Sequence, residues 1–342
     1  MPNSDPTKLK LTKNFGVPGI ALCVARTQGS QLVYGSSDFK VYGVDCLAEK
    51  PEPQAFKGDG HQSYVTGVVR AGNSIVTGSY DGRLIWWNAE TKEQVRSVEA
   101  HALWIRKVIA TADGQFIISV ADDMLAKVWK AETGDLVHTL ADHKPLTPHD
   151  FPSMLFATAV SADGKWLATG DKVGHIAIWD MSTGKKVGEL EAPGLYTWDP
   201  KQRRHSIGGI RSLAFSADSK LLAAGGIGHI GNIDHLDGPS RVEVFEWQAS
   251  KKLFEVVDAK VKGLVEELAF DPNGKWLIGS GGDNSGFVSF YELEKGQVLH
   301  QDKAPMHVHQ FVFNETADAL YAVGHGRVAV FEFKGVETPP AA

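Results

Sequence analysis

Short segments of alternating or continuously apolar residues recur along this chain, and residues 161–190 show their arrangement most clearly. Within that stretch, residues 165–170 and 175–180 each have the length and pattern of a β-strand. Gly164 and Gly184, with their polar neighbours, supply residue types that tolerate turn dihedrals. The pattern therefore predicts a meander of short strands. Because such a meander cannot bury both of its faces alone, it requires copies of itself as neighbours.

The copies can be aligned on the two residues that close the third strand of each unit. In six of seven cases a large aromatic residue precedes a polar one. The pairs are Val44-Asp45, Trp87-Asn88, Trp129-Lys130, Trp179-Asp180, Phe245-Glu246, Tyr291-Glu292 and Phe331-Glu332. The turn between the first two strands forms a second column, with Asp or Asn followed by Gly or Ser at 113–114, 163–164, 218–219 and 273–274. Since both columns share one register, the sequence indicates seven repeats of one unit.

One of these pairs also identifies a family. The run Ile178-Trp179-Asp180 ends in a Trp-Asp dipeptide, within repeats close to the ~40–45 residues expected for one propeller blade. On these residues the chain resembles the WD-repeat β-propeller family over nearly its whole length. The resemblance implies an all-β fold, a seven-bladed β-propeller of four-stranded antiparallel blades.

The seventh unit lacks a fourth strand of its own, and residues 8–14 form a separate strand-like segment before the first unit. We expect this N-terminal strand to complete the last blade and close the ring, which removes an exposed sheet edge. A disordered tail is the alternative. The sequence predicts a single propeller over residues 1–337 and a C-terminal tail at 338–342. Its blades are expected at approximately 17–58, 59–99, 100–141, 142–191, 192–259, 260–303 and 304–335 plus 7–14.

The resemblance also implies a structural role for several polar residues. In the family, a His before the first strand, a Ser or Thr in the second, an Asp after the second and a Trp in the third form a hydrogen-bonded tetrad. The matching residues are His61, Thr77, Asp81 and Trp87, then His101, Ser119, Asp123 and Trp129, and in part His143, Thr169 and Trp179, with Val173 at the Asp position. A buried indole N–H needs such an acceptor. The set recurs in successive repeats without a nucleophile turn, so we interpret it as structural and not as a hydrolytic triad.

Composition narrows the functional classes. The net charge of −6 argues against a general nucleic-acid surface. Only two cysteines occur, which excludes a disulfide framework and favours a reducing compartment. The first residues contain no apolar signal-peptide segment, and no apolar run approaches the ~20 residues that span a bilayer. We therefore expect a cytoplasmic protein that binds neither nucleic acid nor membrane.

Three insertions interrupt the repeats, at residues 144–155, 192–209 and 226–240. From their positions in a four-stranded meander, all three are expected on one face of the ring, over blades four and five, where long loops commonly carry binding residues. The candidate partner-binding residues are His149, Asp150, Tyr196, Trp198, Arg203, Arg204, His229, Asp234, His235 and Asp237. Exposed aromatic and arginine residues resemble interface hot spots. Packing of Tyr196 and Trp198 against a neighbouring loop is the competing interpretation.

Histidines are also concentrated near this face. They are His149, His175, His205, His229, His235, His307, His309 and His325. Imidazole with carboxylate is a ligand set for zinc and related ions, but the spacing matches no metal signature, so the sequence assigns no metal and no cofactor. The favoured function is a non-catalytic scaffold for a protein or peptide, acting as a monomer or as a subunit of a larger assembly. The alternative is a ligand- or metal-binding propeller, with or without enzymatic activity, whose site lies among these histidines.

Overall fold

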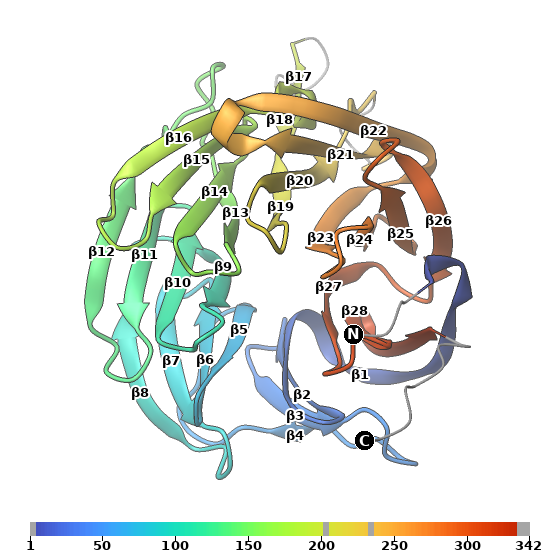
Figure 1. The fold of residues 1–342 in the computed structure, drawn as a ribbon. Helices are drawn as coiled ribbons and strands as arrows, with labels where there is room; N and C mark the ends of the chain where they lie inside the picture. The colour runs from blue at the N-terminus through green and yellow to red at the C-terminus, as the bar shows by residue number, and fades with distance from the viewer. Residues whose placement is uncertain (1–4, 201–204, 232–235, 334–342) are drawn as a thin grey trace.

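The computed structural model describes residues 5–200, 205–231 and 236–333 of the chain. In this part of the chain, antiparallel sheets are arranged as a ring, and the chain runs round the ring from its N-terminus to its C-terminus (Figure 1). The last strand of the chain meets the first where the ring ends join. The prediction of an all-β propeller built from four-stranded antiparallel blades is thus confirmed.

Five sheets of the described chain are four-stranded meanders in which consecutive strands pair. The first two contain β5 (Val65–Ala71), β6 (Ser74–Ser79), β7 (Arg83–Asn88) and β8 (Gln94–Glu99), then β9 (Ile105–Ala110), β10 (Phe116–Ala121), β11 (Leu125–Lys130) and β12 (Leu136–Ala141). The third contains β13 (Leu155–Val160), β14 (Trp166–Asp171), β15 (His175–Asp180) and β16 (Lys186–Glu191). The last two contain β19 (Ile210–Phe215), β20 (Leu221–Ile227), β21 (Pro239–Glu246) and β22 (Lys251–Lys262), then β23 (Leu264–Phe270), β24 (Trp276–Gly282), β25 (Gly286–Glu292) and β26 (Gln297–Ala304).

The remaining large sheet has six strands, so the expectation of seven separate blades is not confirmed. Its strands are, in spatial order, β27 (Val308–Phe313), β28 (Ala319–Phe333), β1 (Leu9–Gln28), β2 (Gln31–Ser36), β3 (Val41–Asp45) and β4 (Gln54–Ala55). The described residues therefore form six blade-sized sheets and not the seven separate blades expected. The reason is that β1 is continuous: its first half pairs with β28 and its second half with β2, which joins the sheets expected to be first and last.

The hydrophobic core lies between adjacent sheets. The middle strands are buried on both faces, as in β6 and β14, whereas the outer strand β8 alternates between exposed and half-buried residues. One core cluster combines Ile178 of β15 with Phe245 of β21, from neighbouring sheets. Each sheet therefore needs its neighbours to bury its apolar residues, which is the reason why the repeat recurs.

The turns between the first two strands keep the geometry that the second sequence column predicts. Gly164 and Gly274 have φ of 71° and 70°, in the left-handed region that favours glycine. Ser219 takes the same conformation, with φ of 60°, at the equivalent position of the β19–β20 turn. These tight turns lie on the face of the ring opposite the insertions, which we call the lower face.

Smaller elements complete the described chain. They are three short 3₁₀ helices, η1 (Pro6–Lys8), η2 (Pro193–Leu195) and η3 (Trp247–Ala249), and a two-stranded hairpin of β17 (Tyr196–Asp199) and β18 (His205–Gly208). The hairpin projects from the ring within the second insertion (Figure 1). None of the helices in the described ranges has the length and apolarity needed to cross a membrane.

Candidate functional site

The strands nearest the ring axis share one irregularity near the top face, the face that carries the insertions. There, the pairing with the second strand shifts by one residue and leaves one residue of the inner strand without a partner in the ladder. These seven residues, the bulge ring, are Leu22, Thr66, Arg106, Phe156, Arg211, Glu266 and His309. All of them line a single cavity of about 230 Å³. The bulges therefore bring seven different side chains to one site on the axis.

One side of this axial cavity is cationic. The Arg106 guanidinium lies 2.8 and 2.6 Å from the two carboxylate oxygens of Asp122, and both Arg106 and Arg211 lie near the Phe156 ring, at 5.3 and 3.8 Å from its centroid. Among the described residues, the Arg211 Nε has no hydrogen-bond partner although it is buried. Lys172 is 5% exposed, and burial together with the charge of Arg211 lowers its pKa. This side offers positive charge that is only partly neutralised.

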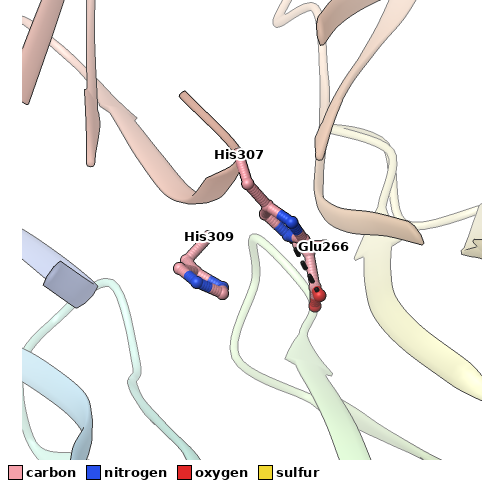
Figure 2. A group of neighbouring side chains, drawn as sticks. All are labelled: Glu266, His307 and His309. Carbon is pink, nitrogen blue, oxygen red and sulfur yellow. Dashed lines mark ion pairs between the residues drawn. The ribbon is translucent and has the colours of Figure 1, made fainter. Parts of the chain in front are cut away.

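Next to Arg211, the cavity wall combines a carboxylate with imidazoles. Glu266 Oε1 lies 3.5 Å from His307 Nε2, and the His309 ring lies beside them (Figure 2). The His307 ring stacks on those of His309 and His325, at centroid distances of 4.6 and 5.0 Å, and the last two rings are tilted at 5.0 Å. Burial alone would raise the pKa of Glu266, but His307 and Arg211 outweigh it and lower that pKa to about 2. Burial also lowers the pKa of His309 to about 4, so at neutral pH this imidazole is uncharged and keeps a lone pair.

A salt bridge spans the ring next to this cavity. Lys107 Nζ of β9 lies 2.7 Å from Glu267 Oε2 of β23, and their side chains are 11% and 16% exposed. Burial raises the pKa of Glu267, although Lys107 acts in the opposite direction. Because both residues follow directly after members of the bulge ring, the bridge joins two inner strands that are not neighbours in the ring.

The insertions pack against one another on the top face. The His149 ring stacks on Trp198 at a centroid distance of 4.1 Å, and its Nδ1 lies 3.1 Å from the Tyr196 hydroxyl. The Ile230 N–H donates to Thr197 Oγ1 at 3.2 Å, which ties the third insertion to the hairpin. The three insertions thus form one surface, which we call the insertion surface. Tyr196 and Trp198 are half-buried within it, which agrees with the packing interpretation.

The other predicted partner-binding residues are spread along this surface or lie outside the described part. Asp150 and His229 are exposed. The Asp237 Oδ1 is buried and has no hydrogen-bond partner among the described residues. Arg203, Arg204, Asp234 and His235 lie outside the described residues. No hydrogen bond joins His149 to His229 or Asp237 within the described ranges, so the predicted set is not brought to a single point.

The residues predicted as tetrads form hydrogen-bonded chains. Trp87 Nε1 donates to Thr77 Oγ1 at 2.8 Å, and His61 connects that hydroxyl, at 2.8 Å, to Asp81, at 3.1 Å. The second chain repeats this order, with 2.9, 2.7 and 3.0 Å separating successive members. Its members are Trp129, Ser119, His101 and Asp123. In both chains every buried polar group finds a partner, which avoids the cost of an unsatisfied indole N–H.

The third chain corrects one assignment. His143 Nδ1 lies 2.9 Å from Asp171 Oδ2, while His143 Nε2 and Trp179 Nε1 meet at Thr169 Oγ1, at 2.8 and 3.0 Å. Val173 does stand at the Asp position of the pattern, but the carboxylate comes from Asp171, two positions earlier, so the expectation that this chain lacks a carboxylate was wrong. Asp171 is the last residue of β14, so its side chain reaches the same imidazole from the strand and not from the turn.

We expect Asp171→Ala to destabilise the protein by about 1–3 kcal/mol, because it leaves His143 buried without its acceptor. Val173→Ala, on the same loop, is the matched control. It removes only two methyl groups from a half-buried side chain and should cost less. Chemical denaturation of both variants measures the difference. Equal losses would show that the Asp171 carboxylate does not stabilise this chain.

Two segments of the chain match the model of a known family. The model of the WD domain, G-beta repeat, matches residues 54–88 and 92–130. The first match contains β4 to β7 and the second β8 to β11, so each spans the outer strand of one sheet and the three inner strands of the next. These matches include both full tetrads, one in each matched range. The chain belongs to the WD-repeat β-propeller family.

Curated relatives share part of this WD-repeat chain. Nuclear distribution protein PAC1-2 of Uncinocarpus reesii is 28% identical over 47% of the chain and 35% of its own length. WD repeat-containing protein SL1-17 of Schistosoma mansoni is 25% identical over 66% of the chain and 63% of its own length. Eukaryotic translation initiation factor 3 subunit I of Candida albicans is 26% identical over 58% and 51%. The matched part of the chain thus spans about a third to about two thirds of these relatives.

Sequence reasoning missed the bulge ring of this WD-repeat protein. It singled out His307, His309 and His325, but not Glu266, Arg106 or Arg211. One signal was present: each of the latter stands near the start of an inner strand, where the pattern expects an apolar residue. A charged residue at that place in three of the repeats indicates a polar axis.

Proposed function

We propose that this WD-repeat protein is a non-catalytic scaffold that binds a protein or peptide through its insertion surface, over the sheets β13–β16 and β19–β22. The observation that carries the proposal is the contact of His149 with Trp198, which joins two insertions into one surface on a rigid ring. Elaborated loops on a rigid scaffold are common binding sites. On the lower face, by contrast, the turns between the first two strands of the sheets are tight.

The relatives support a scaffold in general terms. One is named as a subunit of translation initiation factor 3, and that name places it in an assembly. We propose that the present chain likewise acts beside other proteins. The cytoplasmic location and the absence of catalysis stay predictions, which rest on composition and on the family.

We also propose that the six-stranded sheet acts as two blades, which would make seven in total. The bulge ring supports this count, since seven inner strands each contribute one residue to the axial cavity. A second support is the hydrogen bond from Phe333 N to Asp318 O, at 3.0 Å, which pairs the two ends of β28 as a hairpin. The N-terminal half of β1 would then be the outer strand of the last blade.

The binding proposal is tested by replacing Tyr196, Trp198, Arg203 and Arg204 together with alanine. We expect capture of partners by the full chain, measured by quantitative pull-down, to fall at least tenfold, because aromatic and arginine anchors can each contribute ~2 kcal/mol to binding. The melting temperature should change little, since Tyr196 and Trp198 contact other insertions and belong to none of the hydrophobic core clusters between the sheets.

The matched control replaces Lys165 and Lys220 with alanine. These side chains are 70% and 71% exposed, on the lower face of the same two sheets. Capture should be unchanged in this variant. Unimpaired capture by the quadruple variant, or its early unfolding, would contradict the assignment and favour a packing role alone.

A further inference from the structure

Glu266, His307 and His309 form a cluster at the axial cavity (Figure 2). Glu266 belongs to the bulge of β23, His309 to the bulge of β27, and His307 directly precedes β27. One ligand atom from each residue lies within 4.8 Å of the other two. Two neighbouring inner strands therefore bring two imidazoles and a carboxylate to one point.

The orientation of His307 is set by a backbone group. Its Nδ1 lies 3.0 Å from the carbonyl oxygen of Asp283, an acceptor that requires a proton on that nitrogen. In the neutral ring the Nε2 lone pair then faces the cluster. A hydrogen bond from the far nitrogen to a backbone carbonyl is the usual second-shell support of a metal-binding histidine.

The cluster is not satisfied by hydrogen bonds of its own. Among the described residues, the Nε2 atoms of His307 and His309 are buried without a hydrogen-bond partner, and His307 as a whole is only 6% exposed. The 3.5 Å between His307 Nε2 and Glu266 Oε1 is long for a hydrogen bond. Around a tetrahedral ion with bonds of 2.0–2.1 Å, neighbouring ligand atoms lie about 3.3 Å apart, so this spacing fits a shared ion better.

A second cluster of the same residue types provides a contrast. Asp142, His175 and Glu189 also lie close together, but Lys186 Nζ stands between the two carboxylates, at 2.7 and 2.9 Å. Both nitrogens of His175 have carboxylate partners as well. An ammonium group already supplies the positive charge there. Among the described residues, by contrast, no lysine or arginine forms an ion pair with Glu266.

We propose that Glu266, His307 and His309 bind a divalent transition-metal ion, with Zn²⁺ as the best fit. Two imidazoles and one carboxylate are a ligand set of zinc sites that keep a fourth position open. Here that position faces the axial cavity, where Arg211 contributes positive charge. The open position would therefore take water or an anionic group of a bound molecule. The site lies at the ring axis and is separate from the hairpin residues proposed above to bind a partner.

The test is a calorimetric titration of the chelator-treated full chain with Zn²⁺. We expect one ion per chain in the wild type, and at least about a hundredfold weaker binding in His309→Ala and in Glu266→Gln, since each removes a ligand. Glu266→Gln keeps the size of the side chain. His175→Ala, in the cluster that Lys186 neutralises, is the matched control and should bind Zn²⁺ like the wild type.

Two outcomes would overturn the proposal: a wild type that binds no Zn²⁺, or tight binding that persists in His309→Ala and Glu266→Gln. Loss of binding in His175→Ala with retention in the other two would move the site to the second cluster. Anomalous scattering from a Zn²⁺-soaked wild-type crystal locates the ion independently of how the variants fold. A peak between Glu266, His307 and His309 supports the assignment, and a peak elsewhere alone contradicts it.

Discussion

Removal of residues 1–14 is expected to lower the free energy of unfolding by several kcal/mol and to promote self-association. The first half of β1 pairs with β28 from Leu9, opposite Phe333, to Gly16, opposite Arg327. Without it, the end of β28 becomes an unpaired edge that can pair with another chain. The buried Leu9, 3% exposed, would also leave a core cluster that includes Phe331 and Phe333. Thermal denaturation and light scattering measure the two effects.

Two point variants separate the contribution of this strand from that of the deletion itself. Leu9→Ala should cost about 2–5 kcal/mol, as usual for a leucine removed from a core. Leu11→Ala, on the same strand but 41% exposed, should cost no more than about 0.5 kcal/mol. A truncated protein as stable as the full chain would show that the N-terminal half of β1 does not close the ring.

Lys107→Met is expected to destabilise the protein by about 3–5 kcal/mol, because it leaves the Glu267 carboxylate buried without its partner. The double variant Lys107→Met, Glu267→Met should recover most of this loss, since it removes both charges. As a surface control, Lys165→Met breaks a 3.5 Å pair with Asp163 whose side chains are 70% and 40% exposed, and should cost less than about 1 kcal/mol.

The loss in Lys107→Met should also depend on pH. Burial raises the pKa of Glu267 in the folded protein, so the folded state binds the proton more tightly than the unfolded state. The penalty of the buried charge is therefore absent below the unfolded pKa and develops as pH rises through the folded pKa. Denaturation at a series of pH values should show a smaller difference between Lys107→Met and wild type in acid. A difference that is independent of pH would contradict the role of the Glu267 charge.

Much of the fold followed from local patterns. The strands predicted at residues 165–170 and 175–180 agree with β14 and β15 to within one residue, and the closing pairs of the first six units end β3, β7, β11, β15, β21 and β25. Pattern was sufficient here because every sheet is built from consecutive strands joined by tight turns. The residues that decide each strand and turn then lie within a few positions of one another.

The expectation of seven separate blades was not confirmed, for a non-local reason. Residues 8–14 and the first strand of the first unit looked like two strands, separated by Gly16, Pro18 and Gly19. In the folded chain they are one strand, β1, because β28 supplies pairing partners for its first half from the far end of the sequence. Nothing within residues 8–20 encodes the position of β28, so a break in the pattern was taken for a break in the strand.

The sequence alone determined the repeat, the family and the residues of the first two tetrads, because each depends on residue types at fixed spacing within a unit. The tertiary structure decided which side chains from different strands and repeats contact one another. Asp171 replaces a carboxylate expected two positions later, since its strand places it against His143. Glu266 meets His309 because bulges in two neighbouring strands direct both side chains to the axis, and His307 joins them from the position directly before β27. These contacts depend on how whole sheets pack around the ring. No local sequence pattern predicts them, because the residues involved are far apart along the chain.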